Sequence, residues 1–214
     1  MLTGLGWPAD RLAVLDIGGD ETPLAEAPGP LVAEPATFAG LGGKRARLRQ
    51  AITHLYRQAG GDAPAHALTP GAPLGAIEVD GDACTLCMAC VSVCPTQAVV
   101  GGGESPQLRF HEERCTQCGL CERTCPEDAI TLAPQVDYAA QAEPGERVLH
   151  EEPMHHCPGC GKAFATRKLI ERMEQRLAGH WMFADDTARR RLQLCEDCRV
   201  EAVMRDEGSL HPYK

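Results

Sequence analysis

The sequence predicts an α+β fold in which a small, duplicated metal-cluster module is followed by a metal-binding helical domain. Two runs of four cysteines with the same spacing begin at Cys84 and Cys115, and two cysteine pairs follow from Cys157 and Cys195. Short strand-like segments flank both runs, and helical patterns accompany the later pairs. Only 4% of the 214 residues are aromatic, so the 12 cysteines are expected to help hold the fold.

The chain divides into four regions. Residues 1–74 are predicted to form a partial α/β segment and linker, 75–133 the cluster module, 134–150 a polar linker, and 151–214 a helical domain that binds a metal through four cysteines. The first region has a strand-like run over 11–17 and a helical pattern over 41–59. A lone strand and a lone helix cannot cover both faces of an α/β layer, so they either pack on the module or belong to a piece of a longer protein, the interpretation we favour.

Charge and composition narrow the classes of partner. Residues 1–150 hold 10 Lys/Arg and 19 Asp/Glu, whereas residues 151–214 hold 11 of each. Phosphate binding needs a basic surface, so nucleic acid is not expected as a partner. The acidic part either steers docking onto a basic protein surface or is simply a solvated surface.

The location expected from the sequence is cytoplasmic. The first ten residues lack the pattern of a signal peptide, and no apolar run reaches the roughly 18 residues that would predict membrane insertion. In a reducing compartment, clustered cysteines are metal ligands rather than disulfides.

The chemistry is carried by an internal duplication. Residues 84–99 read CTLCMACVSVCPTQAV, and residues 115–130, 31 positions later, read CTQCGLCERTCPEDAI. Both contain C-x2-C-x2-C-x3-C-P, the spacing of bacterial ferredoxins with two [4Fe–4S] clusters, in which the fourth cysteine of each run ligates the other cluster. The expected halves are related by pseudo-two-fold symmetry. The expected ligands are Cys84, Cys87, Cys90 and Cys125 for cluster I, and Cys115, Cys118, Cys121 and Cys94 for cluster II.

The surroundings of the runs indicate electron transfer rather than catalysis. Glu112, Glu113, Glu127 and Asp128 are expected to be solvated charges, and no catalytic residue is identified. A low reduction potential is expected because every ligand is a thiolate and residues 75–133 hold nine acidic residues against three arginines. The apolar residues expected to shield the clusters from water are Ile77, Val79, Val93, Val99, Leu108, Phe110, Leu120, Ile130 and Leu132.

A second metal site is predicted near the C-terminus. Cys157 and Cys160 form one C-x2-C pair, and Cys195 and Cys198 form another. Two such pairs predict a tetrahedral, structural zinc site. With a helix over 166–177 between the pairs and the second pair at a helix start, the domain resembles a treble-clef zinc fold. The alternatives are a single iron, as in rubredoxin, and a redox-active dithiol.

Several stretches together resemble a known group of proteins. They are LGGKRARLRQAITHL, CTLCMACVSVCP, CTQCGLCERTCPEDAI, FATRKLIERM and LCEDCRV. They resemble the C-terminal part of 4Fe–4S proteins associated with formate dehydrogenases. The segment LGWPADRLAVLDIGGDE is similar to the end of a small iron–sulfur subunit domain of hydrogenases or heterodisulfide reductases.

The resemblance implies a non-catalytic electron-transfer protein or subunit whose partner is a molybdenum- or tungsten-containing formate dehydrogenase. Two alternatives stay open. One is the wiring subunit of a hydrogenase- or heterodisulfide-reductase-like complex, and the other is a redox-sensing assembly or regulatory factor.

Overall fold

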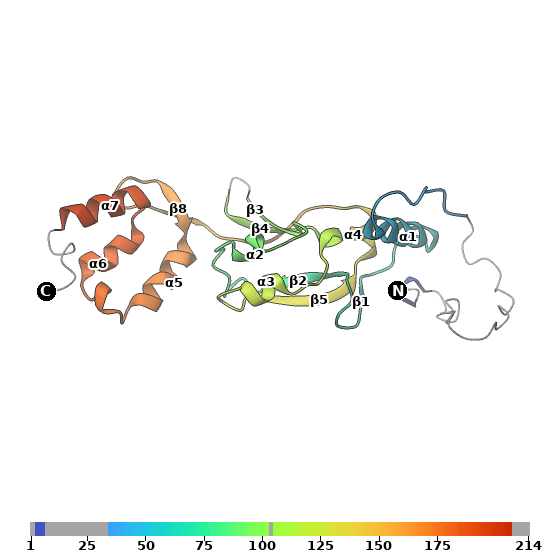
Figure 1. Cartoon of the computed structure of the whole chain (residues 1–214), viewed down its shortest axis with the longest axis horizontal. Helices are drawn as coiled ribbons and strands as arrows, with labels where there is room; N and C mark the ends of the chain where they lie inside the picture. Colours follow the sequence, from blue (N-terminus) through green and yellow to red (C-terminus); the bar gives the residue numbers. More distant parts are fainter. Residues whose placement is uncertain (1–2, 7–33, 103–104, 207–214) are drawn as a thin grey trace.

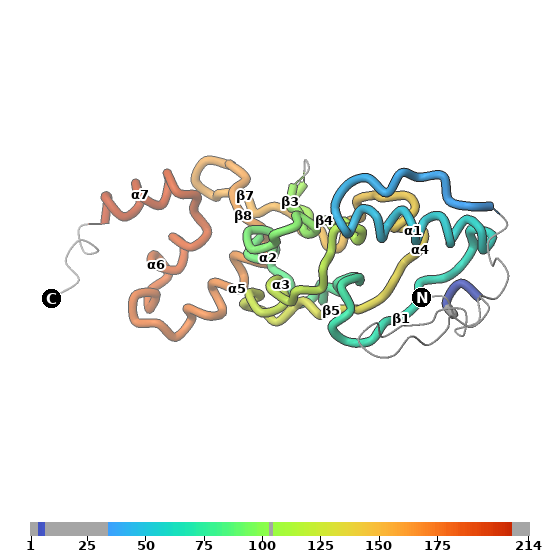
Figure 2. The backbone as a smooth tube through the Cα atoms, turned by 45° about the vertical axis from the view of Figure 1, so that its right-hand side comes forward, coloured from blue at the N-terminus to red at the C-terminus, as the bar shows by residue number. Residues whose placement is uncertain are grey.

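The computed structural model describes residues 3–6, 34–102 and 105–206. The predicted strand over 11–17 lies outside these ranges. The described parts are arranged along one long axis, with helix α1 at one end, the two cysteine runs in the middle and the C-terminal helices at the other end (Figures 1 and 2). Helices and antiparallel sheets are mixed, as the sequence predicts.

Helix α1 (Lys44–Gln58) packs on the cluster module rather than standing alone. Its residue Ile52 is only 1% exposed and shares a core with Leu74, Val136 and Tyr138. The Tyr56 and Tyr138 rings stack with their centroids 6.0 Å apart. Of the two expectations for this helix, the structure therefore shows packing against the module.

Two antiparallel sheets build the module. In the first, β5 (Ile130–Val136) lies between β2 (Gly75–Val79) and β1 (His66–Ala67). In the second, β4 (Gln107–Phe110) lies between β3 (Val99–Gly101) and β6 (Arg147–Glu151). The remaining short elements are α2 (Ala89–Ser92), the 3-10 helix Glu112–Arg114, α3 (Leu120–Thr124) and α4 (Tyr138–Ala142), with a further 3-10 turn at Thr3–Leu5.

The linkers predicted around the module are wrong in part. Residues 134–150 contain the end of β5, helix α4 and most of β6, which pairs with β4. Before the module, β1 adds to the edge of β5. The strands β1 and β6 lie at sheet edges and are partly exposed to solvent, so their composition is that of a linker although their backbones are paired.

The backbone of the two runs repeats with the sequence. Non-glycine residues with positive φ occur at equivalent positions 31 apart, where Leu86 and Gln117 both have φ of 54°. Gln97 and Asp128 have φ of 52° and 50°, and Met88 at 61° corresponds to Gly119 at 76°. Left-handed conformations are costly for residues other than glycine, so their recurrence shows that both loops curl in the same way. The pseudo-two-fold relation of the halves stays a prediction.

The core of the module surrounds the cysteines. Ile77, Val99, Leu108, Phe110 and Ile130 are buried as predicted. Val79 and Leu132 are partly buried against the same core, and Val93 is half-buried. Leu120 corrects the prediction, since it is 42% exposed at the start of α3.

The C-terminal unit consists of a two-stranded hairpin and three helices. Strands β7 and β8 pair antiparallel, and α5 begins after Thr166, whose side chain accepts a hydrogen bond from the Leu169 N–H. The helix predicted over 166–177 is confirmed to within one residue. The bounds are β7 (Met154–His156), β8 (Ala163–Thr166), α5 (Arg167–Leu177), α6 (Asp186–Arg190) and α7 (Glu196–Arg205), with 3-10 turns at Trp181–Phe183 and Arg191–Gln193.

Among the residues described, no helix combines the length and the apolar character needed to cross a membrane.

Candidate metal centres

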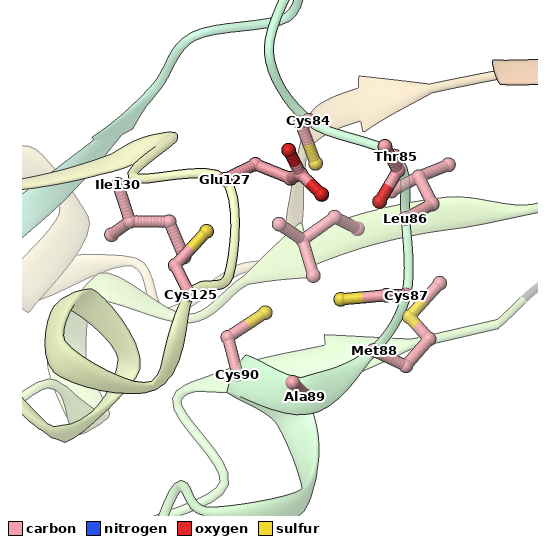
Figure 3. A pocket seen from close by; sticks show the side chains of 11 residues that line it. Cys84, Thr85, Leu86, Cys87, Met88, Ala89, Cys90, Cys125, Glu127 and Ile130 are labelled. Carbon is pink, nitrogen blue, oxygen red and sulfur yellow. The ribbon is translucent and has the colours of Figure 1, made fainter. Parts of the chain in front are cut away.

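The first hollow gathers the cysteines predicted for cluster I. Cys84 and Cys87 come from the loop between β2 and α2, Cys90 lies in α2, and Cys125 follows α3. Their side chains line one space, into which the sulfur atoms converge (Figure 3). The other lining residues are Thr85, Leu86, Met88, Ala89, Leu108, Glu127 and Ile130.

The second hollow gathers the cysteines predicted for cluster II. Cys115 and Cys118 come from the loop that leads into α3, Cys121 lies in α3, and Cys94 comes from the end of the first run. The other lining residues are Thr96, Ala98, Val99, Thr116, Gly119, Leu120 and Leu132. In each hollow, therefore, the fourth cysteine belongs to the opposite run.

Burial makes these sites suited to a bound cation. Desolvation raises the pKa of Cys90 to about 12 and that of Cys121 to about 11. It also raises the pKa values of Cys84 and Cys115. Buried thiols would stay protonated at neutral pH, and a bound metal supplies the positive charge that ionises them.

Backbone N–H groups support the crossing cysteines at equivalent positions. The Ala98 N–H donates to Cys94 Sγ at 3.3 Å, and the Ala129 N–H donates to Cys125 Sγ at 3.3 Å. Burial alone would raise the pKa of Cys94, but hydrogen bonds from Val99, Thr96 and Ala98 outweigh it and lower that pKa. Such N–H···S bonds are the outer-shell support expected of iron–sulfur ligands.

One ligand of each hollow faces the surface. Cys87 and Cys118, the second cysteines of the two runs, are exposed, whereas Cys84, Cys90, Cys115 and Cys121 are buried. Each hollow is therefore closest to solvent at the second cysteine of a run.

Acidic residues of the module correct a second prediction. Glu112 and Glu113 are only 4% and 5% exposed, and the Glu127 side chain is 6% exposed. Glu112 accepts from Gln135 Nε2 at 2.9 Å and pairs with Arg147 at 3.1 Å. Burial raises the pKa of Glu112. These carboxylates are not solvated charges. Cations from segments distant in the sequence cover Glu112 and Glu127, and Glu113 lies beside its neighbours His111 and Arg114, whereas Asp128 is exposed as expected.

Arg45 of α1 holds the loop that leads into the second run. Its Nε donates to the Glu113 carbonyl at 2.9 Å and its Nη1 to the Pro73 carbonyl at 2.8 Å. Its Nη2 donates to the carbonyl of Cys115. Helix α1 is thus tied to the cluster II site through a single side chain.

Gln117 adds a side-chain contact to the second hollow. Its Nε2 donates to Cys115 Sγ at 3.3 Å and to the Ala76 carbonyl at 2.7 Å. The equivalent residue of the first run is Leu86, which has no amide. Aligning the two runs position by position would have found this difference in the sequence.

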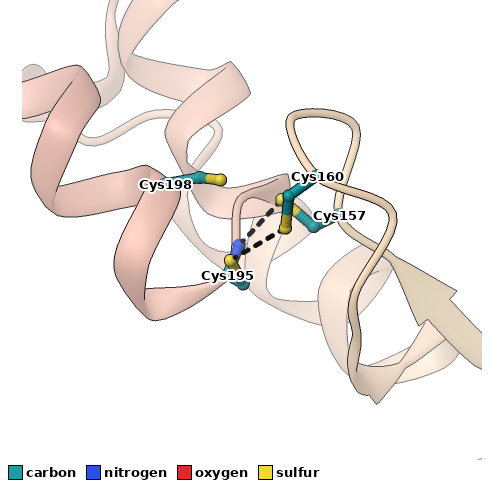
Figure 4. A group of neighbouring side chains, drawn as sticks. All are labelled: Cys157, Cys160, Cys195 and Cys198. Atoms are coloured by element: carbon teal, nitrogen blue, oxygen red, sulfur yellow. Dashed lines mark hydrogen bonds between the residues drawn. The ribbon is translucent and has the colours of Figure 1, made fainter.

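The four remaining cysteines form a compact site in the C-terminal unit. Cys157 and Cys160 lie on the loop between β7 and β8, Cys195 precedes α7, and Cys198 lies in its first turn (Figure 4). Their sulfur atoms all lie within 4.8 Å of one another. Within 34–102 and 105–206 no other group of three or more possible ligands is this close. A single ion needs such proximity, whereas a four-iron cluster needs its ligands spread around a cube.

The surroundings of the Cys157 sulfur favour its thiolate form. Burial raises its pKa, but the N–H groups of Cys195 at 3.3 Å and Gly159 at 3.4 Å donate to it, and the net result is a pKa of about 6. Cys198, in contrast, has its pKa raised because Cys160 and Cys195 lie beside it. Four converging sulfurs with N–H donors at one of them fit a metal ion.

The histidines next to this site have polar partners. His155 Nε2 bonds with the Gln193 carbonyl at 3.1 Å, and His156 Nδ1 bonds with the Gly161 carbonyl at 3.1 Å. Both histidines therefore brace the loops that carry the cysteines.

Comparison with known proteins identifies the central module. A family model described as a 4Fe-4S dicluster domain matches residues 83–129, which contain both cysteine runs. No curated protein matches the chain. Residues 83–129 are therefore similar to a 4Fe-4S dicluster domain, which supports the binding of 4Fe–4S iron–sulfur clusters, and neither comparison connects the chain with formate dehydrogenase.

Proposed function

We propose that the chain transfers electrons through two [4Fe–4S] clusters as the non-catalytic component of an oxidoreductase complex. The carrying observation is that each of two hollows holds three cysteines of one run and the fourth of the other. When bound, each such cluster accepts and releases one electron. The match of residues 83–129 to the dicluster domain supports this function.

The residues of the module hold the clusters and limit the access of water. Cys84, Cys87, Cys90 and Cys125 are proposed to hold cluster I, and Cys94, Cys115, Cys118 and Cys121 cluster II. The walls of both hollows are mainly apolar. Leu108, which is 1% exposed, lines the first hollow, and Val99, which is 3% exposed, lines the second. Low polarity next to a cluster favours a low potential, and the exposed Cys87 and Cys118 mark the sides at which a partner approaches.

The C-terminal four-cysteine site is proposed to hold structural zinc in a treble-clef-like unit. A Zn–S distance of about 2.3 Å places neighbouring sulfurs of a tetrahedron about 3.8 Å apart. Cys160 and Cys195 have their sulfurs 3.6 Å apart, too far for a disulfide and close to this value. All four positions are filled by sulfur, so the ion would stabilise the fold and leave no place for a substrate.

Metal analysis of the purified chain tests both assignments. We expect about eight iron and one zinc per chain, from two four-iron clusters and one S4 site. Nine iron and no zinc would replace the zinc by a rubredoxin-like iron. Eight iron with two or four reactive thiols in the tail would favour the dithiol alternative.

The proposed partner is a molybdenum- or tungsten-containing formate dehydrogenase. It rests on the resemblance of the cysteine runs and tail motifs, and the acidic excess of residues 1–150 favours a basic docking surface on any partner. The test is anaerobic mixing of the chain with such an enzyme and formate, with cluster reduction followed by EPR. A Cys84→Ser variant is the matched control, because it lacks one predicted ligand.

The outcomes separate the competing functions. Reduction by formate and the enzyme, slowed by added salt, supports the proposed partner. Reduction only with a hydrogenase or a heterodisulfide-reductase-like enzyme moves the chain to that complex. Clusters that no low-potential donor reduces would exclude electron transfer and favour an assembly or regulatory factor whose clusters stabilise the fold.

A further inference from the structure

The two hollows differ in charge at one equivalent position. Glu127 lines the cluster I hollow, and the residue 31 positions earlier, Thr96, lines the cluster II hollow. Figure 3 shows the Glu127 carboxylate between Cys84 and Cys125, and its side chain is only 6% exposed. A buried carboxylate beside a cluster opposes the arrival of another negative charge.

Two arginines of the C-terminal unit cover this carboxylate. Arg172 pairs with Glu127 Oε2 through Nε at 2.7 Å and Nη2 at 2.6 Å. Arg176 pairs with Oε1 at 3.0 Å and also donates to the Pro126 carbonyl at 3.2 Å. Both oxygens of Glu127 are therefore bound, and the three side chains together carry a net charge of +1.

Helix α5 is fixed in this position by contacts at its start. Thr166 Oγ1 donates to the Thr85 carbonyl at 2.8 Å in a buried hydrogen bond. Lys168 Nζ donates to the Gly81 carbonyl at 2.6 Å and lies 2.5 Å from Glu152 Oε1. Residues 168, 172 and 176 are spaced four apart, so these cations form one stripe of α5 facing the cluster I loop.

We propose that Arg172 and Arg176 are positioning residues for electron transfer that raise the reduction potential of cluster I through Glu127. The inference rests on the proposed function, because it requires a cluster held by Cys84, Cys87, Cys90 and Cys125. Reduction brings one electron from the donor into this hollow and adds one negative charge there. The two guanidinium groups lower the free-energy cost of that charge. The C-terminal unit therefore forms part of the cluster I site, in addition to holding its own four-cysteine site.

The test is an EPR-monitored redox titration of the full chain with dithionite as donor. The step lost in Cys84→Ser identifies cluster I. The double variant R172Q/R176Q leaves Glu127 unpaired and is expected to lower the potential of cluster I by at least about 59 mV, a tenfold change for one electron. E127Q keeps both arginines and is expected to raise it. The triple variant is expected to fall between wild type and R172Q/R176Q.

Matched variants separate this effect from general damage or surface charge. R190Q/R205Q removes two exposed arginines of the same unit and is expected to leave both potentials unchanged. R172K/R176K keeps both charges, so its equilibrium constant for reduction of cluster I is expected to stay within threefold of the wild-type value. T96E places an uncompensated carboxylate at the second hollow and is expected to lower the reduction potential of cluster II.

The results distinguish failure of the inference from failure of the proposed function. The inference is overturned if the clusters are present and reducible but the equilibrium constant for reduction of cluster I in R172Q/R176Q stays within twofold of the wild-type value. It is also overturned if R190Q/R205Q shifts cluster I equally. If R172Q/R176Q loses iron, the E127Q variant provides the test instead. An unchanged or lowered reduction potential of cluster I in E127Q then rejects the inference. Absence of reducible iron in the wild-type chain rejects the proposed function itself.

Discussion

The two cluster sites have the same local backbone and different surroundings. Leu86 and Gln117 share a φ of 54°, and each crossing cysteine accepts one N–H at 3.3 Å. Beyond the loops, cluster II is joined to α1 through Arg45, whereas cluster I is covered by α5. The duplication thus supplies two sites of one kind, and the flanking segments make them unequal.

The difference has a chemical consequence. The first hollow contains a carboxylate held by cations of another unit, and the second contains a neutral threonine and a glutamine amide that donates to a cysteine sulfur. Charge and N–H···S bonding are two of the factors that set cluster potentials. Two clusters with different potentials give electrons a preferred direction.

The largest effect is expected from the crossing ligands. Cys125→Ser lies in the second run but should abolish cluster I, because its sulfur lies in the hollow with Cys84, Cys87 and Cys90. Iron should fall from about eight to about four per chain, with the fold destabilised. Iron analysis and EPR measure this. The spectrum should match that of Cys84→Ser, and a match to Cys115→Ser instead would refute the crossing.

Next come the two flanking anchors. Arg45→Ala removes three hydrogen bonds from a charged donor to carbonyls near cluster II, and should cost about 3 kcal/mol. Lys168→Ala removes one such bond and one partly exposed ion pair near cluster I, and should cost about 1 kcal/mol. Anaerobic denaturation followed by cluster absorbance measures both. Equal losses would show that the two flanks contribute alike.

Two glycines test how tightly the chain packs beside each cysteine run, Gly75 next to the second run and Gly101 next to the first. A Cβ at Gly75 would lie 2.5 Å from the Ala133 carbonyl oxygen and 2.5 Å from Gln117 Cδ, so Gly75→Ala should cost about 2 kcal/mol. A Cβ at Gly101 would lie 2.9 Å from Met88 Sδ, the movable end of a flexible side chain. Gly101→Ala should therefore cost less than about 1 kcal/mol. Denaturation midpoints rank the two, and the reverse order would contradict the packing argument.

The smallest effect is expected from Gln117. Gln117→Leu gives the second run the residue found at the equivalent place of the first, and removes the N–H donor 3.3 Å from Cys115 Sγ. Loss of this donor should lower the reduction potential of cluster II. The expected decrease corresponds to an equilibrium constant for reduction that is about threefold smaller. In the same titration, the cluster I step serves as an internal control. A rise in the potential of cluster II would contradict the assigned role of the amide.

Local sequence determined the metal sites because their ligands lie in short, regularly spaced runs. The eight cysteines of residues 84–125 converge in the two predicted sets, and Cys157, Cys160, Cys195 and Cys198 converge in a third. Spacing of three or four residues fixes how a loop can present its thiols, whatever surrounds it. The helix over 166–177 followed from periodicity for the same local reason.

Only the tertiary structure decided what surrounds those sites. The pairing of β6 with β4, the burial of Glu112 and Glu113, and the approach of Arg172 and Arg176 to Glu127 join residues far apart in the chain. In sequence these residues look like a linker and like surface charges, because a charged side chain is cheap to place in water and costly to bury without its partner. Partners separated by 45 and 49 positions leave no local pattern. The sequence therefore determined which cysteines converge, and the fold decided how the surroundings of the two predicted cluster sites differ.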